Sequence, residues 1–302
     1  MNSIKLSVVI THLDEPFELH ESLRNIVAAL PPDSEIIIVD DGSGGYGSTT
    51  AEAVAKFHGA RFWRLPENKG VPSAMNAGLD LAAGKWVYFA ACGDFVQSRF
   101  FHAALAQLEV HEYLSPVMCC AKSLWKDTET GVEWVDSKRI NLRGFVKPDE
   151  VANRIRSRAL HITSHTTIFR TEALRNLGGF DLDFKWHCDF YATHRLALEH
   201  GICFVPEVGV HVNLRRGSYS DVDRYVEEHR RVVADIFEAA PDSFENVLDL
   251  LGWPAFECAI VWNRWKRLRS FRFLWRCLRR EMDALGRRYL PAWAQRLAIK
   301  LT

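Results

Sequence analysis

Apolar and polar positions follow two alternating periods over the first hundred residues. Four apolar runs have the length of buried strands and lie at residues 6–10, 35–39, 60–65 and 85–90. Segments with helical spacing separate or follow them, at residues 17–30, 48–57, 71–83 and 98–110. Strands and helices that alternate with short connections are typical of a mostly parallel sheet wrapped by helices. The pattern therefore predicts an α/β fold.

The rest of the chain is less regular. A further strand is expected at residues 116–121, and residues 122–158 read as loops and short strands. Order returns at residues 166–169, 171–177, 188–200 and 202–205, and everything beyond residue 219 reads as helix. We therefore predict one α/β domain over residues 1–220 and a helical, basic and amphipathic region over residues 221–302.

Composition supports a folded protein and excludes several classes. The chain has 302 residues, of which 48% are hydrophobic and 25% charged, so it can bury a large core. The seven cysteines include no CxxC pair, which argues against a zinc site or a disulfide framework. No apolar run approaches the roughly 18 residues of a membrane span, and the N-terminus lacks signal-peptide features. We expect a cytoplasmic protein.

Acidic residues gather where the predicted strands end. The sequences THLDE, DDGS and ACGD follow the first, second and fourth strands, at the edge where open parallel sheets bind ligands. Carboxylates grouped in this way repel one another unless they meet a cation or a ligand, and a divalent metal bridging to a phosphate answers that need. The dinucleotide motif GxGxxG after the first strand and the P-loop are both absent.

These segments, in order, resemble a known family. SVVITHLDE, EIIIVDDGS and ENKGVPSAMNAGLDLAAGKWVYFAACGD look like the nucleotide-sugar half of inverting family 2 glycosyltransferases. LGGFD followed by CDFY resembles that family's acceptor-side segment. The resemblance covers residues 6–220 and implies the GT-A fold, with a donor half over about residues 1–121 and an acceptor half over about residues 122–220.

The resemblance implies a donor site. Thr11 and Asp41 match the positions that hold the nucleobase, with Glu15 and Asp40 beside them. Lys69 lies near where the family places a cation against the diphosphate. The implied donor is a nucleoside-diphosphate sugar, with a UDP-sugar favoured.

It also implies the reacting groups. Asp94 matches the last acid of the metal motif and would bind Mn²⁺ or Mg²⁺ on the donor diphosphate, offsetting charge on the leaving group. Asp189 matches the general base for the acceptor hydroxyl, and one base without a nucleophile implies inversion. His165 either lines the acceptor pocket or is a satisfied core histidine. His211 and Arg215 either touch the diphosphate or belong to a solvated turn.

The chain departs from the family pattern at three places. Residues 91–93 leave Asp94 as the sole carboxylate of the metal segment, Leu13 replaces the usual aromatic residue, and Cys188 replaces the usual Glu. Helix capping is the alternative reading of both Asp94 and Asp189.

Charge is distributed unevenly although the whole chain holds 38 basic and 38 acidic residues. Residues 261–302 contain 12 Lys or Arg and 2 acids, and residues 262–288 carry a Trp, Leu and Phe stripe bordered by arginines. That pattern favours a helix at an anionic membrane surface, and packing on the catalytic domain is the alternative. Nucleic acid is not expected as a partner, since no base-reading motif is present.

Together these features predict a metal-dependent inverting glycosyltransferase (EC 2.4) that acts on a glycan or a lipid-linked saccharide. Cell-surface polysaccharide or lipopolysaccharide synthesis fits such an acceptor, at the cytoplasmic face of the membrane. A non-catalytic GT-A relative that binds nucleotide or acts as a scaffold is the alternative. A sugar-nucleotide pyrophosphorylase would need a glycine-rich loop with Arg and Lys after the first strand, which this sequence lacks.

Overall fold

A computed structural model of the protein describes residues 4–136, 142–157, 159–215 and 226–241, together with residues 244 and 247. The chain divides into two units, Met1–Arg224 and Tyr225–Thr302. Helix α8 (Val226–Ala239) belongs to the second unit. The amphipathic stripe at residues 262–288 lies outside the described residues, and the assignment of donor and acceptor halves stays a prediction.

A mixed sheet forms the centre of the first unit. Its strands are β1 (Leu6–His12), β2 (Ser34–Asp40), β3 (Arg61–Arg64), β4 (Trp86–Ala91), β5 (Phe95–Val96), β6 (Met118–Asp127), β7 (Glu133–Val135), β8 (Gly144–Val146), β9 (Ile168–Arg170) and β10 (Ile202–Leu214). They lie in the order β3-β2-β1-β4-β9-β6-β10-β5, with β7 beside β6 and β8 beside β10. Strands β1 to β4 pair in parallel, as do β6 and β10, whereas β9 runs antiparallel between the two groups.

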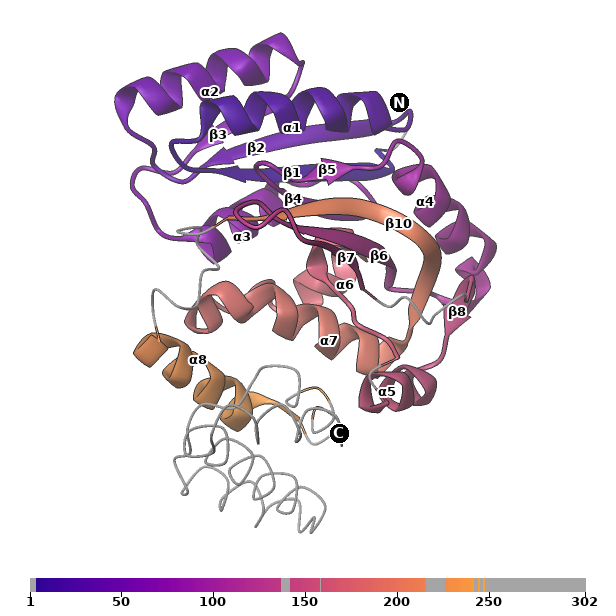
Figure 1. The fold of residues 1–302 in the computed structure, drawn as a ribbon. Helices are drawn as coiled ribbons and strands as arrows, with labels where there is room; N and C mark the ends of the chain where they lie inside the picture. Colours follow the sequence, from indigo (N-terminus) through magenta and orange to yellow (C-terminus); the bar gives the residue numbers. More distant parts are fainter. Residues whose placement is uncertain are drawn as a thin grey trace. The chain divides into compact units, whose positions relative to one another are not determined.

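Helices cover both faces of this sheet (Figure 1). The α-helices of the first unit are α1 (Pro16–Ala29), α2 (Gly45–Phe57), α3 (Val71–Leu81), α4 (Phe100–Val110), α5 (Pro148–Arg156), α6 (Thr171–Asn176) and α7 (Cys188–His200). The 3-10 helices are η1 (Glu112–Leu114), η2 (Ser164–Thr166) and η3 (Leu182–His187). Helices α1, α2 and α4 share one hydrophobic cluster with the sheet, and α3 lies on the opposite face.

The apolar run of β1 explains why both faces are covered. Val8 and Ile10 are buried in the cluster that also contains Leu23 of α1. Successive side chains of a strand point to opposite faces, so Val9 points toward α3. A Cβ on Gly78 would lie 2.2 Å from Val9 Cγ1, and the missing side chain lets α3 approach the sheet closely. The predicted α/β fold with helices on both faces is confirmed.

The strand predicted at residues 202–205 is much longer in the structure. β10 continues to Leu214 and pairs with β6 along its length. The register shifts between Val205 and Val208 and again before Val210, so the irregularity accommodates Pro206, which has no N–H for the ladder. A proline ends a predicted strand in sequence, but a bulge allows the strand to continue.

The weak pattern at residues 122–158 conceals the helix α5. Pro148 lies in its first turn with Asp149 and Glu150, and Arg154 and Arg156 lie in its last turn. Acids at the start and bases at the end suit the helix dipole, so the sequence does carry a signal for this helix.

The parallel register brings the candidate site residues to one edge of the sheet. His12 lies opposite Asp40, and Thr11 lies opposite both Val39 and Ala91. The sequences THLDE, DDGS and ACGD therefore leave β1, β2 and β4 at the same edge.

Candidate active site

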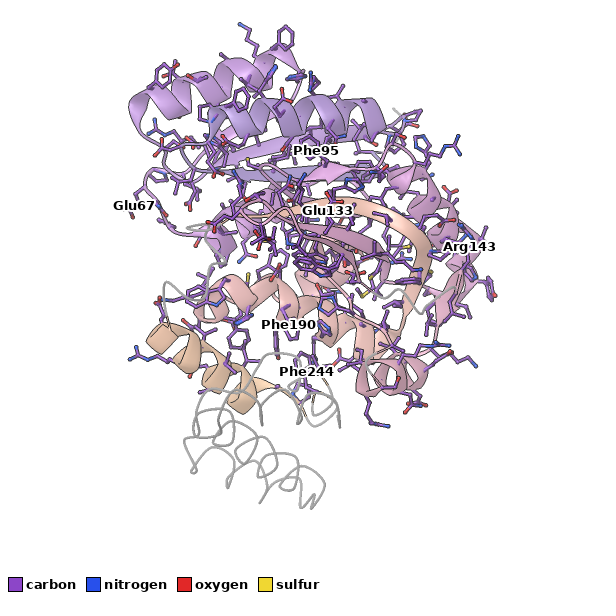
Figure 2. All side chains as sticks on the ribbon, in the orientation of Figure 1. Glu67, Phe95, Glu133, Arg143, Phe190 and Phe244 are labelled. Carbon is purple, nitrogen blue, oxygen red and sulfur yellow. The ribbon has the colours of Figure 1, made fainter. Side chains whose placement is uncertain are left out.

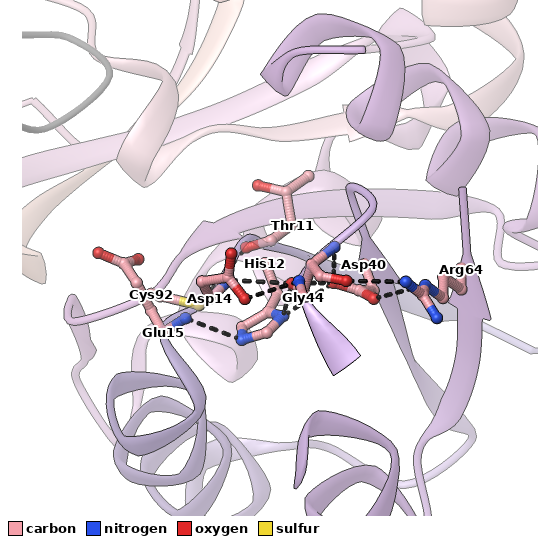
Figure 3. Close-up of polar contacts among 9 residues, drawn as sticks. Thr11, His12, Asp14, Glu15, Asp40, Gly44, Arg64 and Cys92 are labelled. Carbon is pink, nitrogen blue, oxygen red and sulfur yellow. Dashed lines mark hydrogen bonds and ion pairs between the residues drawn. The ribbon is translucent and has the colours of Figure 1, made fainter. Parts of the chain in front are cut away.

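A buried histidine and a buried aspartate pair at the ends of the first two strands (Figure 3). His12 Nδ1 lies 3.2 Å from Asp40 Oδ1, and neither side chain is exposed. The backbone N–H of Glu15 donates to His12 Nε2 over 3.1 Å, so Nδ1 carries the ring proton and donates to Asp40. Sequence reasoning identified Asp40 and Glu15 but missed His12.

Asp40 keeps its charge inside this cluster. Burial raises the pKa of Asp40, but hydrogen bonds from Ser43, Ser48 and His12 outweigh it, so the pKa is lowered from its usual value. Arg64 Nε lies 3.5 Å from Asp40 Oδ2, and Arg64 Nη2 donates to the Ser43 carbonyl over 2.7 Å. These contacts fix the Asp40 carboxylate between the ends of β1 and β2, and its assignment to the nucleotide site stays a prediction.

The loops that follow β1 and β2 are tied to each other. The Asp14 N–H donates to the Ser43 hydroxyl over 2.9 Å, and the Gly44 N–H donates to Asp14 Oδ1 over 2.9 Å. A Cβ on Gly47 would lie 2.3 Å from Asp14 Oδ1, so glycine lets α2 begin against the first loop. The two loops thus form one hydrogen-bonded unit.

The three residues that the resemblance assigns to the nucleotide and diphosphate lie at this edge. Asp41 Oδ1 accepts a hydrogen bond from the backbone N–H of Lys69 over 2.8 Å. Burial and the charge of Asp40 raise the pKa of Asp41, against the hydrogen bonds from Lys69 and Gly70. The Lys69 side chain is half exposed, and the side chain of Thr11 points away from the buried cluster (Figure 3).

A tight turn after β4 places Asp94 where three segments meet. Gly93 has a φ of 90°, which glycine adopts without strain. Asp94 Oδ1 accepts from the backbone N–H of Asn213 over 3.2 Å, and Asp94 Oδ2 lies 2.7 Å from Nδ1 of His165. Burial lowers the pKa of His165, whereas the charges of Asp94 and Asp189 raise it by a larger amount. The pKa of His165 is therefore raised overall. His165 contacts Asp94 directly, whereas Asp189 acts on its pKa through charge alone.

Asp189 joins the same cluster from α7. The Ser164 hydroxyl donates to Asp189 Oδ2, and the Phe190 N–H donates to Oδ1 over 2.7 Å. Ser164 and His165 are consecutive residues of η2, so this short helix contacts Asp189 with one side chain and Asp94 with the next. Three residues chosen separately from the sequence therefore meet in space.

Neither carboxylate caps a helix. The N-cap residue of α7 is His187, and Asp189 lies inside the first turn. The N-cap residue of α4 is Arg99, and Asp94 precedes the short strand β5. The alternative reading of these aspartates as helix caps is wrong.

Arg215 closes one side of the site. Its Nη2 donates to the Cys92 carbonyl over 2.7 Å, and its Nη1 lies 3.7 Å from Glu15 and 3.6 Å from Glu18. Burial raises the pKa of Glu15 and Glu18 adds to the rise, while Arg215 lowers it, so the net direction is upward. His211 lies apart from Arg215, with Nε2 at 2.8 Å from Gln97 Nε2.

Asn76 connects α3 to the segment that follows α6. Its amide donates to the Phe180 carbonyl and accepts from the Phe180 N–H, both over 2.8 Å. A Cβ on Gly179 would lie 2.5 Å from Asn76 Oδ1, so the glycines of LGGFD allow this close contact. Asn76 stands within the segment ENKGVPSAMNAG, which the sequence analysis quoted for the family resemblance without giving Asn76 a role.

The Asp94 carboxylate suits a metal ion that also takes ligands from a phosphate-containing substrate. Among the described residues, no group of three or more His, Cys, Asp or Glu side chains lies together to hold an ion. Mg²⁺ commonly binds through one or two carboxylates, with phosphate and water oxygens completing the set. A carboxylate has about four lone-pair sites, so Asp94 can ligate an ion while it accepts from Asn213 and His165.

Comparison of sequences identifies relatives of this chain. The family described as Glycosyl transferase family 2 matches residues 7–178. The Escherichia coli (strain K12) protein "Uncharacterized glycosyltransferase YibD" is 26% identical over 166 residues, which are 52% of this chain and 46% of that protein. The match thus spans about half of that relative's length.

Solved structures share the fold. Staphylococcus aureus TarS 1–349 in complex with UDP has a TM-score of 0.60 at 18% identity, covering 82% of this chain and 70% of that chain. The mannosyltransferase PcManGT from Pyrobaculum calidifontis, in complex with GDP-Man and Mn²⁺, has a TM-score of 0.60 at 16% identity. The match covers 95% of this chain and 81% of that chain. At such identities the likeness establishes the fold alone, which is the GT-A fold predicted from the sequence.

Proposed function

The chain belongs to glycosyl transferase family 2, and we propose that it moves a sugar from a nucleoside-diphosphate sugar to a hydroxyl of a saccharide acceptor. The displacement is direct, with inversion at the sugar carbon. A UDP-sugar is the favoured donor. UDP in the TarS complex and GDP-Man in the PcManGT complex support a nucleotide-sugar donor for a chain of this fold.

One observation carries the proposal. Asp94 and Asp189, which are 95 positions apart, both contact η2, through His165 and Ser164 respectively. A transferase needs its diphosphate site and its base within reach of one sugar carbon. Stable loops alone would not require two carboxylates from distant segments to meet at consecutive residues of η2.

The donor site is built from the ends of β1, β2 and β4. Thr11 and Asp41 hold the nucleoside, and the ammonium of Lys69 faces the diphosphate. Asp94 supplies a ligand to the divalent ion, Mn²⁺ or Mg²⁺, which offsets negative charge on the leaving group. The Mn²⁺ in the PcManGT complex supports this use of a metal.

The acceptor site is built around Asp189. Its carboxylate accepts from Ser164 and from the Phe190 backbone, and further lone pairs can accept the proton of an acceptor hydroxyl. The Ser164 hydroxyl holds the carboxylate in place, so the acceptor oxygen is activated at a fixed position.

The acceptor is proposed to be a glycan or a lipid-linked saccharide of cell-surface polysaccharide or lipopolysaccharide synthesis. The basic stripe at residues 262–288 supports an anionic membrane surface as a partner. No helix in the described part of the chain is long and apolar enough to cross a membrane. Attachment at the cytoplasmic face would bring the site to a lipid-linked acceptor.

A second candidate is a non-catalytic relative that binds nucleotide as a scaffold. The segment at residues 91–94 favours it, because Asp94 is the one carboxylate left there. Such a protein would bind a nucleotide and release no product from a nucleotide-sugar.

The first experiment is a thermal-shift panel with UDP, GDP and dTDP, each with and without Mn²⁺. A ligand at about 100 times its Kd stabilises by roughly 2.7 kcal/mol, which is readily measured. We expect one nucleotide to raise the Tm of the wild type only with Mn²⁺, and Asp94→Asn to abolish that shift. Asp80→Asn, an exposed residue of α3, is the matched control and should behave as the wild type.

The outcomes separate the two candidates. A metal-dependent shift followed by nucleotide release from the corresponding nucleotide-sugar supports the transferase. A shift without turnover supports the scaffold. If no nucleotide raises the Tm under any condition, the proposed donor site is wrong.

A further inference from the structure

Two tryptophans stack on each other on the β6–β7 hairpin. Trp125 and Trp134 lie directly opposite each other in the antiparallel register. Their ring centroids are 6.3 Å apart and their planes differ by 8°. Trp134 is 39% exposed, so one large aromatic side chain of this pair meets solvent.

An ion pair across the hairpin and a hydrogen bond to Trp125 fix the position of the two rings. Successive side chains of a strand point to opposite faces, so Lys126 and Glu133 lie behind the tryptophans, with their charged groups 3.5 Å apart. The indole N–H of Trp125 donates to Asp136 over 3.3 Å. Figure 2 labels Glu133, which precedes Trp134 on β7. The rings are thus oriented before any ligand arrives.

The same surface continues into the candidate active site. The rings of Trp125 and His165 make an edge-to-face contact, with their centroids 5.6 Å apart and their planes at 77°. His165 contacts Asp94, and its neighbour Ser164 contacts Asp189. From the reacting groups outward, the order is His165, Trp125 and then Trp134.

This position has a topological cause. β9 pairs with only the first residues of β6, at Met118 and Cys119, and β7 pairs with β6 farther along, from Leu124. Between the two, the Thr166 hydroxyl of η2 donates to the Ala121 carbonyl over 2.8 Å. β10 pairs with the other edge of β6 along its length, so β7 lies on the same edge of β6 as β9, just beyond η2.

We propose that Trp134, supported by Trp125, is the platform on which a pyranose ring of the saccharide acceptor stacks, which places an acceptor hydroxyl at Asp189. A pyranose has an apolar C–H face and polar edges. The electron-rich face of an indole suits the C–H face, while the hydroxyls stay in contact with water and charged neighbours. A lipid chain would need a continuous apolar groove, whereas the exposed ring of this pair is the single indole of Trp134. The inference rests on the proposed transferase function.

The test measures saccharide binding by the full chain in the presence of the nucleotide that raises its Tm. Saturation-transfer NMR with maltotriose, cellotriose, mannotriose and chitotriose provides the probes. We expect at least one of them to bind through its C–H protons. Trp134→Ala should weaken that binding about tenfold, and Trp134→Phe should retain most of it.

Trp63→Ala is the matched control, since Trp63 is 51% exposed on β3, at the opposite end of the sheet order. Unchanged binding by Trp134→Ala, or equal loss in Trp63→Ala, overturns the platform. Wild-type protein that binds nucleotide but none of the four saccharides also overturns it, while the transferase proposal stands. If neither nucleotide nor saccharide binds, both proposals fail.

Discussion

Two of the histidine–aspartate pairs in the first unit differ in their access to solvent. His12 and Asp40 are 3.2 Å apart with both side chains fully buried, whereas His165 and Asp94 are 2.7 Å apart with side-chain exposures of 30% and 9%. The closed pair is surrounded by protein donors and ties two loops together. The open pair lies between a candidate diphosphate site and a candidate base. The same two residue types thus stabilise the fold in one place and remain available for chemistry in the other.

The largest effect should come from Asp189, the carboxylate that contacts η2 through Ser164, next to the histidine of the open pair. Asp189→Asn removes the base, and we expect turnover to fall by about 10²- to 10⁴-fold. The measurement is nucleotide release from the nucleotide-sugar with the saccharide that binds. Nucleotide binding should persist, because Asp189 contacts η2 and not the donor loops.

Asp80→Asn again serves as the control, since this exposed aspartate on α3 should leave turnover unchanged. If Asp189→Asn retains turnover within a few fold of the wild type, the open pair has no catalytic carboxylate beside it. The distinction between a structural pair and a chemical pair would then lose its basis.

The closed pair should dominate stability. His12→Ala leaves the buried Asp40 without one of its donors and opens a cavity, so we expect a loss of about 2–4 kcal/mol in the free energy of unfolding. His165→Ala should cost about 1 kcal/mol or less, because water can reach the partly exposed Asp94 pair. Urea unfolding of both variants measures the contrast, with His102→Ala on the exposed face of α4 as the control. Equal losses from His12 and His165 would contradict it.

The sequence predicts the open pair's aspartate better than the closed pair. Asp94 follows a continuous apolar strand and falls on a recognisable motif. Asp189 also falls on such a motif, at the start of a helix. Binding of a ligand at these two residues, as proposed above, would restrict both residue type and spacing, and such a restriction is visible in a sequence. The four parallel strands are predicted for the same reason, since burial on both faces demands continuous apolar runs.

His12 and Trp134 were missed because their roles arise only from pairing across strands. His12 sits within an apolar strand, and its partner is set by the parallel register with Asp40. Trp134 lies in the irregular stretch at residues 122–158. It pairs with Trp125 through a hairpin that the hydrophobic pattern of the sequence does not predict. Contacts between strands depend on register, which a single sequence reveals only after the fold is known.

The smallest effect concerns the pH at which His194 on α7 and Asp40 in the closed pair lose their contributions to the free energy of unfolding. Burial, helped by the charge of His161, lowers the pKa of His194 on α7 to about 3. The group is neutral when folded and protonates when unfolded, so its stabilising contribution is complete above about pH 6.5 and declines as the pH falls from there. The pKa of Asp40 is lowered, so its contribution to stability is complete above about pH 4 and is lost as the pH falls below that value.

Lowering the pH from 7 to 5 should therefore cost the wild type about 2 kcal/mol more than His194→Leu, which cannot titrate. Urea unfolding at the two pH values measures this difference, and His102→Ala should follow the wild type because His102 is exposed. A slope in His194→Leu equal to that of the wild type would mean that His194 does not resist protonation. The helix that carries Asp189 would then be no more sensitive to mild acid than the donor loops, and pH would not separate the two regions.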